Sequence, residues 1–325
     1  MRLIVPVVLL VLVAAVPFAV PWLEVVLTIA LAKGFAVLGI VVLLRAGQVS
    51  FGHALFFAAS AYAAAFLTRA LGGTDLIVLL VAGMASAAVL GVLIGAFVVR
   101  YRYIFFAMLN LAFSMVLYSM LEKFFYITGG SDGMRLARPT FLGMTLDRAE
   151  FESAMFYLVL ALAVVAAWLV HRYFVSPPGQ ALMAIKTNET RLEYLGVSAR
   201  GMLLIGYVIS AVLAGLGGTI LAMIQGLVTP EFGYWVRSGE FVFIAILGGT
   251  GHVIGAFAGA LVYELVRTYA AAFAADVWQL TLGVFLLLII LFASRGLVGL
   301  YQDLMRLLLG RPPGARPMAA GKAEG

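Results

Sequence analysis

The sequence contains no cysteine among its 325 residues. Disulfide bonds, thiolate metal sites and a thiol nucleophile are therefore excluded. Charged residues are also scarce: they make up 11% of the chain against 64% hydrophobic residues, and the charged share of a soluble domain is about twice as large. A composition so poor in charge and so rich in apolar side chains predicts an integral membrane protein.

Residues suited to catalysis are few as well. The three histidines, His53, His171 and His252, lie on separate segments, and no HExxH, GxSxG or paired-carboxylate pattern occurs. None of the lysines closes a phosphate-binding GxxxxGK[ST] loop. The net charge of +6 is scattered between apolar runs, which argues against nucleic-acid binding. The sequence thus indicates no catalytic site, metal or cofactor, and ATP-driven work would have to be powered by another chain.

Long apolar runs make up most of what is present. They predict an all-α polytopic membrane protein with about eight full transmembrane helices and one re-entrant broken helix pair. The expected full spans are residues 3–20, 22–44, 50–70, 76–99, 103–121, 153–171, 202–224 and 277–293. We interpret the first as an uncleaved span rather than a secretion signal, because it lacks a clear cleavage site.

The positive charges favour one orientation in the membrane. With the N-terminus inside, thirteen of the 21 Lys and Arg residues lie in inner loops or the C-terminal tail, and seven lie in outer loops. We therefore expect a protein of the bacterial or archaeal cytoplasmic (inner) membrane with both termini cytoplasmic. Residues 1–294 would form a single transmembrane domain, and 295–325 a cytoplasmic tail that is partly disordered.

The broken pair is expected within residues 239–269, around the turn from Gly248 to Gly251. A single crossing there would place the basic tail outside, whereas a re-entrant pair leaves the tail inside. Broken backbone at membrane depth is tolerated only where it is buried in protein or lines a watery path. The run from Gly47 to His53 is a similar break, so the two could belong to a duplicated unit, as in many transporters.

A polar segment, residues 176–201, separates two spans and predicts two short helices. Leu182 and Ile185 are spaced for one helical face, and Leu192 and Leu195 for another. A small amphipathic knob of this kind suits docking to a soluble partner. The alternative is a tolerant loop that happens to be helical.

Local capping signals support the second of these helices. Thr190 and Glu193 have the spacing of a capping box, and Gly196 stands where a left-handed C-terminal cap is expected.

Polar residues within the spans leave two interpretations open. A charge at the centre of a bilayer costs roughly 2.5–3.5 kcal/mol on insertion scales, so Lys33, with Asn110 and Glu264, should face protein or water. They could belong to a pathway, or they could be snorkelling or interhelical contacts. The glycines after Thr128 could likewise form a rigid external rim or an ordinary loop.

Several runs carry a family resemblance. They are 46–54 (AGQVSFGHA), 106–113 (FAMLNLAF), 128–134 (TGGSDGM), 179–186 (GQALMAIK), 194–197 (YLGV), 228–231 (VTPE) and 247–251 (LGGTG). In this order they resemble the membrane subunits of branched-chain amino-acid ABC importers, over about residues 25–295. The long external middle loop is similar to that of one of the two permeases usually paired in these importers.

The resemblance implies an ABC importer permease-like bundle that forms half of a translocation pore. It also implies a second homologous permease, two cytoplasmic ATP-binding subunits and an external solute-binding protein as partners in the lipid bilayer. The expected solute is a branched-chain or other hydrophobic amino acid, with urea, short amides or another small solute as alternatives. A self-sufficient secondary carrier and a membrane scaffold without transport are the competing classes.

Three groups of functional residues are expected. The translocation pathway would include Gly47, Gln48, Ser50, Gly52, His53, Asn110, Gly248, Gly249 and Gly251. The ATPase-docking residues would be Gln180, Thr190, Glu193 and Gly196, and the external-loop residues Thr128, Gly129, Gly130, Asp132 and Gly133. The residues that depart from the family pattern are Lys33, Ile40, Leu44 and Arg45. These departures surround the first motif and leave the solute open.

Overall fold

A computed structural model describes residues 13–17, 20, 22–273, 280, 283–284, 287–288 and 296–300 of the chain. The expected spans 3–20 and 277–293 and the tail 295–325 therefore lie largely outside the described residues. The other six expected full spans and the broken pair lie within them.

Among the described residues, seven helices are long and apolar enough to cross a membrane. They are α2 (Leu23–Arg45), α3 (His53–Leu71), α4 (Leu76–Val98), α5 (Tyr103–Lys123), α7 (Arg148–Val175), α9 (Ala199–Gln225) and α11 (Val253–Phe273). Six of them match the expected full spans, and α11 is the long half of the broken pair. The fold is therefore that of an all-α polytopic membrane protein, as predicted.

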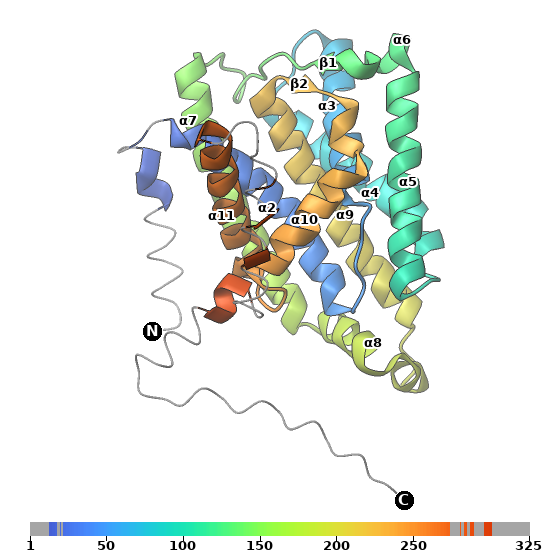
Figure 1. Ribbon diagram of the computed structural model, residues 1–325. Coiled ribbons are helices and arrows are strands. Elements are labelled where there is room, and N and C mark those ends of the chain that lie inside the picture. The colour runs from blue at the N-terminus through green and yellow to red at the C-terminus, as the bar shows by residue number, and fades with distance from the viewer. Residues whose placement is uncertain are drawn as a thin grey trace, which may run out of the picture.

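Shorter elements connect these helices. They are α6 (Phe125–Thr128), η1 (Gly130–Asp132), β1 (Met134–Arg135), α8 (Pro177–Tyr194), β2 (Leu227–Val228), η2 (Pro230–Gly233) and α10 (Trp235–Gly248). Figure 1 shows α8 at one end of the bundle and the antiparallel β1–β2 pair at the other. We call these two ends the α8 face and the β face.

Helices α2 and α9 form the centre of the bundle, and α9 also packs against α3 and α4. Small residues make this close packing possible. A Cβ added at Gly218 would overlap the carbonyl oxygen of Phe57 on α3, and one at Gly217 would overlap that of Ala32 on α2. Backbones that approach this closely are typical of helix contacts in membranes. The glycines of α9 are thus packing residues.

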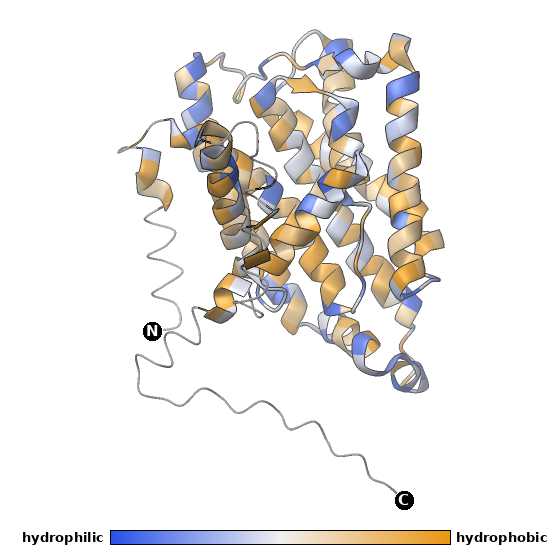
Figure 2. Ribbon diagram, in the orientation of Figure 1, coloured by the Kyte–Doolittle hydropathy of each residue, from blue (hydrophilic) through white to orange (hydrophobic). Residues whose placement is uncertain are grey.

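The outer sides of the bundle are apolar. Large hydrophobic side chains such as Leu93 on α4 and Phe105 on α5 are about two-thirds exposed. Figure 2 shows hydrophobic colour along most of the long helices, with hydrophilic colour mostly toward their ends. This distribution suits contact with lipid or with another membrane chain.

Helices α10 and α11 form the broken pair. With 14 residues, α10 is about 21 Å long and cannot cross a hydrocarbon core of about 30 Å. It runs toward the α8 face, and α11 then returns to the β face (Figure 1). Near that face, the ring of Tyr269 on α11 lies 6.3 Å from that of Trp22, just before α2. The structure has the predicted broken pair, and its second half is itself long enough to cross a membrane. That the pair is re-entrant stays a prediction.

Candidate functional site

Residues 46–52 form a non-helical segment that rises from the α8 face between α2 and α3. At its base, the backbone N–H of Tyr103, the first residue of α5, donates to Gln48 Oε1 over 2.8 Å. At its top, a Cβ added at Gly52 would lie 2.6 Å from the backbone oxygen of Asn110. Asn110 is seven residues along α5 from Tyr103, so the segment climbs about 10 Å beside that helix.

A second non-helical segment, η2, meets α5 from the direction of the β face. Ser114 Oγ on α5 donates to the backbone oxygen of Gly233 over 2.9 Å. Just beyond, the backbone N–H of Ala54 at the start of α3 donates to Ser238 Oγ on α10 over 2.9 Å. Both breaks therefore lie at membrane depth and are buried against other helices, as broken backbone must be.

The polar side chains at the top of the 46–52 segment are fully buried and hydrogen-bonded between helices. His53 Nε2 lies 2.5 Å from Ser210 Oγ on α9. The hydroxyl of Tyr207, one turn before Ser210, donates to Asn110 Oδ1 over 2.5 Å, and Asn110 Nδ2 donates to the oxygen of Phe106. Two predicted pathway residues thus form a polar hub with α9 rather than lining open space within this chain.

The α9 members of this hub, Ser210 and Tyr207, were not predicted from the sequence. They lie one turn apart on a helix rich in Gly and Ala, where a lone hydroxyl gives little local signal. Within the 46–52 segment, Ser50 Oγ accepts a hydrogen bond from the backbone N–H of Gly52 over 3.3 Å. Like His53 and Asn110, Ser50 is buried.

The base of the 46–52 segment rests on α8. Gly47 has a φ of +73°, and a Cβ added there would lie 3.1 Å from Lys186 Cγ on α8. Next to it, the Arg45 guanidinium lies 4.5 Å from the Phe174 ring and donates to the backbone oxygens of Phe174 and Gly179. Arg45, which departs from the family pattern, therefore fixes the α7–α8 corner to the end of α2.

The glycine turn between α10 and α11 lies near the α8 face. Gly249 has a φ of +100°, and the atoms nearest to a Cβ added at Gly248 belong to Gly255 on α11. Gly251 is exposed, with open space around its α-carbon. The immediate neighbours of the turn are thus Gly255 on α11 and Gly296, where an added Cβ would lie 2.5 Å from the α-carbon of Gly249. A shared conduit with Gly47–His53 stays a prediction.

Lys33 is an interhelical contact. Its Nζ donates to Glu240 Oε1 on α10 over 2.6 Å and to Glu264 Oε2 on α11 over 2.7 Å, and its side chain is 1% exposed. Arg237 and Arg267 flank the two carboxylates at 3.9 Å and 3.3 Å. This buried ion-pair cluster ties both halves of the broken pair to α2. Glu240 was missed in the sequence, although it is an acidic residue within an apolar run.

Helix α8 has the predicted two-part form but not the predicted cap. Asn188 interrupts it with φ −160° and ψ 96°, and Asn188 Oδ1 accepts from the backbone N–H of Arg191 over 2.9 Å. Asn188 therefore caps the second half, and Thr190 lies inside that half. The predicted capping box between Thr190 and Glu193 was wrong, because the side-chain amide of Asn188 already accepts from the free backbone N–H of Arg191. Gly196 has the expected left-handed conformation, with φ +79°.

The two predicted apolar faces of α8 differ in outcome. Leu182 and Ile185 are buried, and so is Leu192, but Leu195 is 76% exposed. Its neighbour Tyr194 is 87% exposed. Two large apolar side chains thus project from the tip of α8 with no cover from the described part of this chain.

Other polar residues of α8 form hydrogen bonds with neighbouring elements of the same chain. Gln180 Nε2 donates to the backbone oxygen of Phe174 at the end of α7 over 2.8 Å. Glu189 accepts two hydrogen bonds from the Arg102 guanidinium, at 2.6 Å and 2.9 Å, next to the start of α5. Of the expected docking residues, Gln180 is therefore engaged in holding the α7–α8 corner, whereas Glu193 is exposed.

The predicted external loop is a fixed rim. Thr128 Oγ1 donates to the backbone oxygens of Leu121 and Phe124, at 2.5 Å and 2.9 Å. The φ angles are +78° at Gly129 and +73° at Gly133, where a Cβ would overlap the oxygen of Val228. The β1–β2 pair then joins the loop to the segment after α9. Two further residues of the expected set lie within the rim: Gly130 is buried and Asp132 is exposed.

Comparison with known proteins gives the class of this one. The family model described as the branched-chain amino acid transport system permease component matches residues 22–293. The chain belongs to this family, and it is therefore a permease component of a branched-chain amino acid ABC transport system. The seven candidate spans and the bacterial relatives agree with a multi-pass inner-membrane protein.

Among its relatives are three transport permeases. The LivM permease of the high-affinity branched-chain amino acid system of Escherichia coli is 28% identical over 289 residues, 82% of this chain and 68% of LivM. The LivH permease of the same organism is 26% identical over 147 residues, 45% of this chain and 47% of LivH. The autoinducer 2 import permease LsrC of Klebsiella pneumoniae is 27% identical over 159 residues, 47% of this chain and 43% of LsrC. No solved structure matches the chain.

Proposed function

We propose that this chain forms one half of the translocation pathway of a binding-protein-dependent ABC importer for branched-chain or other hydrophobic amino acids. The second half is a homologous permease, ATP hydrolysis takes place on two cytoplasmic subunits, and an external binding protein delivers the solute. The α8 face is cytoplasmic in this proposal. Residues 1–294 then form the membrane domain, and the tail 295–325 is cytoplasmic.

The contact between α8 and the 46–52 segment carries the proposal. The tip of α8 presents exposed Tyr194 and Leu195, the kind of apolar anchor that a partner protein covers. In the first half of α8, before the interruption at Asn188, Lys186 lies beside Gly47, at the base of the segment that leads to His53. A partner that moves α8 would therefore move the break directly, as coupling between two sites requires.

The 46–52 segment and the Gly248–Gly251 turn are the walls we assign to the pathway. Within this chain Asn110 and His53 Nε2 have protein hydrogen-bond partners that hold the break in place, whereas His53 Nδ1 is buried without a partner among the described residues. Gly248 and Gly249 are buried, so the exposed Gly251 is the part of this turn that would meet the second permease or the solute.

The solute is the least specified part. LivM and LivH are named for branched-chain amino acids, whereas LsrC is named for autoinducer 2. A different small solute, such as urea or a short amide, is therefore the second candidate. The buried carboxylates Glu240 and Glu264 are engaged with Lys33, which weakens the alternative of a proton-coupled secondary carrier.

Reconstitution of the full complex with its binding protein in liposomes tests this function. We expect uptake of labelled leucine, isoleucine or valine that requires both ATP and the binding protein, with urea and acetamide as comparison solutes. If the complex takes up urea or acetamide but none of the three amino acids, the assigned solute class changes from amino acids to small amides. Solute uptake by this chain alone, without ATPase subunits, would overturn the importer assignment.

A further inference from the structure

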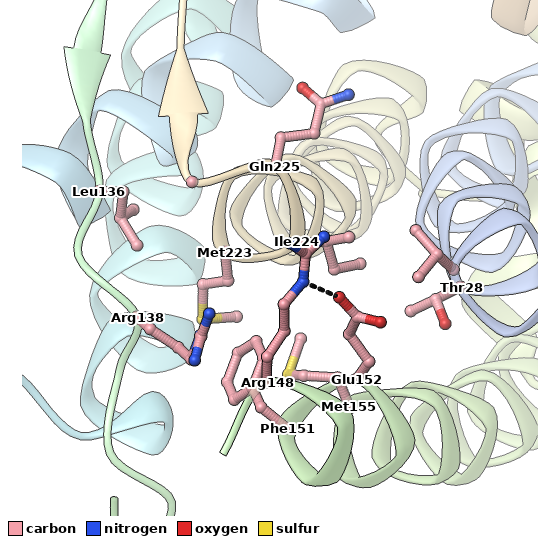
Figure 3. Close-up of a pocket in the computed structure, with 12 residues that line it drawn as sticks. Thr28, Leu136, Arg138, Arg148, Phe151, Glu152, Met155, Met223, Ile224 and Gln225 are labelled. Carbon is pink, nitrogen blue, oxygen red and sulfur yellow. Dashed lines mark hydrogen bonds and ion pairs between the residues drawn. The ribbon is translucent and has the colours of Figure 1, made fainter. Parts of the chain in front are cut away.

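A cavity of about 290 Å³ opens at the β face, between the start of α2, the start of α7 and the end of α9. It is separate from the 46–52 break and from the Gly248–Gly251 turn. Its walls combine three charged side chains with a larger number of apolar ones (Figure 3). The apolar lining residues are Val25, Leu136, Phe151, Met155, Met223 and Ile224.

Two arginines enter the cavity from different parts of the chain. Arg138, on the segment after β1, lies with its guanidinium 5.8 Å from the Phe151 ring. Arg148, the first residue of α7, donates from Nε to Glu152 Oε1 over 2.8 Å. Figure 3 shows both guanidinium groups beside the end of α9. Within the described part of the chain, no hydrogen bond occupies the Arg138 guanidinium, so its donors can bind an oxyanion.

Glu152 supplies the opposite charge at a short distance. Arg148 donates to one carboxylate oxygen of Glu152, and Figure 3 shows the other oxygen turned toward Thr28 on α2. The Thr28 hydroxyl donates to the backbone oxygen of Glu24, one turn earlier. The free oxygen of Glu152 can therefore accept a hydrogen bond from a ligand ammonium group.

The cavity lies at the level where a bilayer carries its headgroups. Helices α2 and α7 begin and α9 ends there, and Trp22, one turn before Val25, forms an edge contact with Tyr269. Trp and Tyr are enriched at this depth of membrane proteins. Farther along α7, Trp168 and Leu169 are exposed, as side chains that face lipid are.

We propose that this cavity binds the headgroup of a zwitterionic phospholipid of the phosphatidylethanolamine class. Arg138 and Arg148 bind the phosphate, Glu152 accepts from the ammonium group, and the glycerol end lies along the apolar wall. A free amino acid also joins an oxyanion to an ammonium group, but its binding would not need a site at headgroup depth beside a lipid-facing helix.

The test measures the phospholipid that stays bound to the complete complex purified in detergent. We expect the double variant Arg138→Ala/Arg148→Ala to retain roughly tenfold less phosphatidylethanolamine than the unaltered complex, because two charged hydrogen-bond donors are lost. Arg69→Ala is the matched control, since it removes an exposed arginine near the end of α3 at the same face, outside this cavity. Equal retention in all three complexes would overturn the proposal.

A second variant tests the ammonium contact. Glu152→Gln should keep phospholipid but lose the preference for phosphatidylethanolamine over phosphatidylglycerol. An unchanged preference would contradict the assignment of Glu152.

Adding different ligands to the complex distinguishes a lipid site from a site for other molecules that carry the same charged groups. Dioctanoyl phosphatidylethanolamine should raise the melting temperature of the delipidated complex, and Arg138→Ala/Arg148→Ala should abolish the rise. Leucine or inorganic phosphate should not reproduce it at matched concentration. A leucine response lost in the double variant would identify a solute site instead. Loss of binding-protein affinity with normal lipid retention would identify a protein-docking site instead.

Discussion

At the residue scale, Lys33 shows how a costly group is accommodated in a membrane protein. An isolated lysine at this depth would be strongly unfavourable, but two carboxylates from the two halves of the broken pair lie within 2.7 Å of its Nζ. Removal of one partner from a buried ion pair leaves an uncompensated charge and costs about 3–5 kcal/mol. The cluster therefore fixes α10 and α11 on α2 only while all of its members are present.

The first prediction concerns this cluster. Lys33→Met should lower the free energy of unfolding by about 3 kcal/mol, the lower end of that range, because Arg237 and Arg267 remain beside the carboxylates. Glu264→Gln alone should also destabilise, and the double variant should lose less than the sum of the two. Thermal unfolding of the purified protein in detergent measures all three. Additive effects would mean that Lys33 and Glu264 do not interact.

Such pairs also mark the limit of sequence reasoning at this scale. The polar character of Lys33, Asn110 and Glu264 is visible locally, and each was expected to face protein or water. The identity of the partner is not visible, because Glu240 is 207 positions from Lys33 and Tyr207 is 97 from Asn110. Only the packing of whole helices brings these residues together, and no periodicity in a single segment encodes that packing.

At the element scale, α8 is the part whose function can be separated from its stability. Gly196 ends it in a left-handed conformation with φ +79° and has open space around its α-carbon. Gly143, in the loop after β1, has φ +80° and equally open space, but it lies far along the chain from α8. A side chain in either position is opposed by the same backbone strain, of about 1–2 kcal/mol.

The equal backbone geometry of Gly196 and Gly143 gives the second prediction. Gly196→Val and Gly143→Val should destabilise the protein to a similar, small extent. Only Gly196→Val should reduce uptake and weaken co-purification of the ATP-binding subunits, because it redirects the tip that carries Tyr194 and Leu195. Transport and ATPase co-purification at matched expression measure the difference. If both variants, or neither, lose uptake, the docking role of α8 is wrong.

Element boundaries followed from the sequence where apolar runs end in Gly, Pro or charge. The expected spans 22–44 and 76–99 differ by only a residue or two from α2 and α4. The span expected at 153–171 is longer in the structure, because α7 begins at Arg148 with a capping box between Asp147 and Glu150. That box was missed, and one was wrongly assigned at Thr190, because several polar residues compete to cap each helix.

At the scale of the whole molecule, the two faces of the bundle differ in kind. The β face carries a rim that is held in place by the hydrogen bonds of Thr128 and by the β1–β2 pair. The α8 face carries a projecting helix with exposed apolar side chains. The broken pair of α10 and α11 starts and ends toward the β face. Within the described residues the loops at the two faces carry seven Lys and Arg residues each, so the prediction that the α8 side is cytoplasmic depends on the positive charges of the N-terminus and of the tail 295–325.

The third prediction tests this orientation with single cysteines, which are unambiguous labels because the chain has none of its own. Asp132→Cys and Tyr194→Cys both replace exposed side chains, on the rim and at the tip of α8. In intact cells a membrane-impermeant maleimide should label Asp132→Cys alone, and permeabilised cells should show both labelled. Because both positions are exposed in the structure, a Tyr194→Cys signal in intact cells would place α8 outside. An ATPase could not dock there, and the proposed import mechanism would fail together with the orientation.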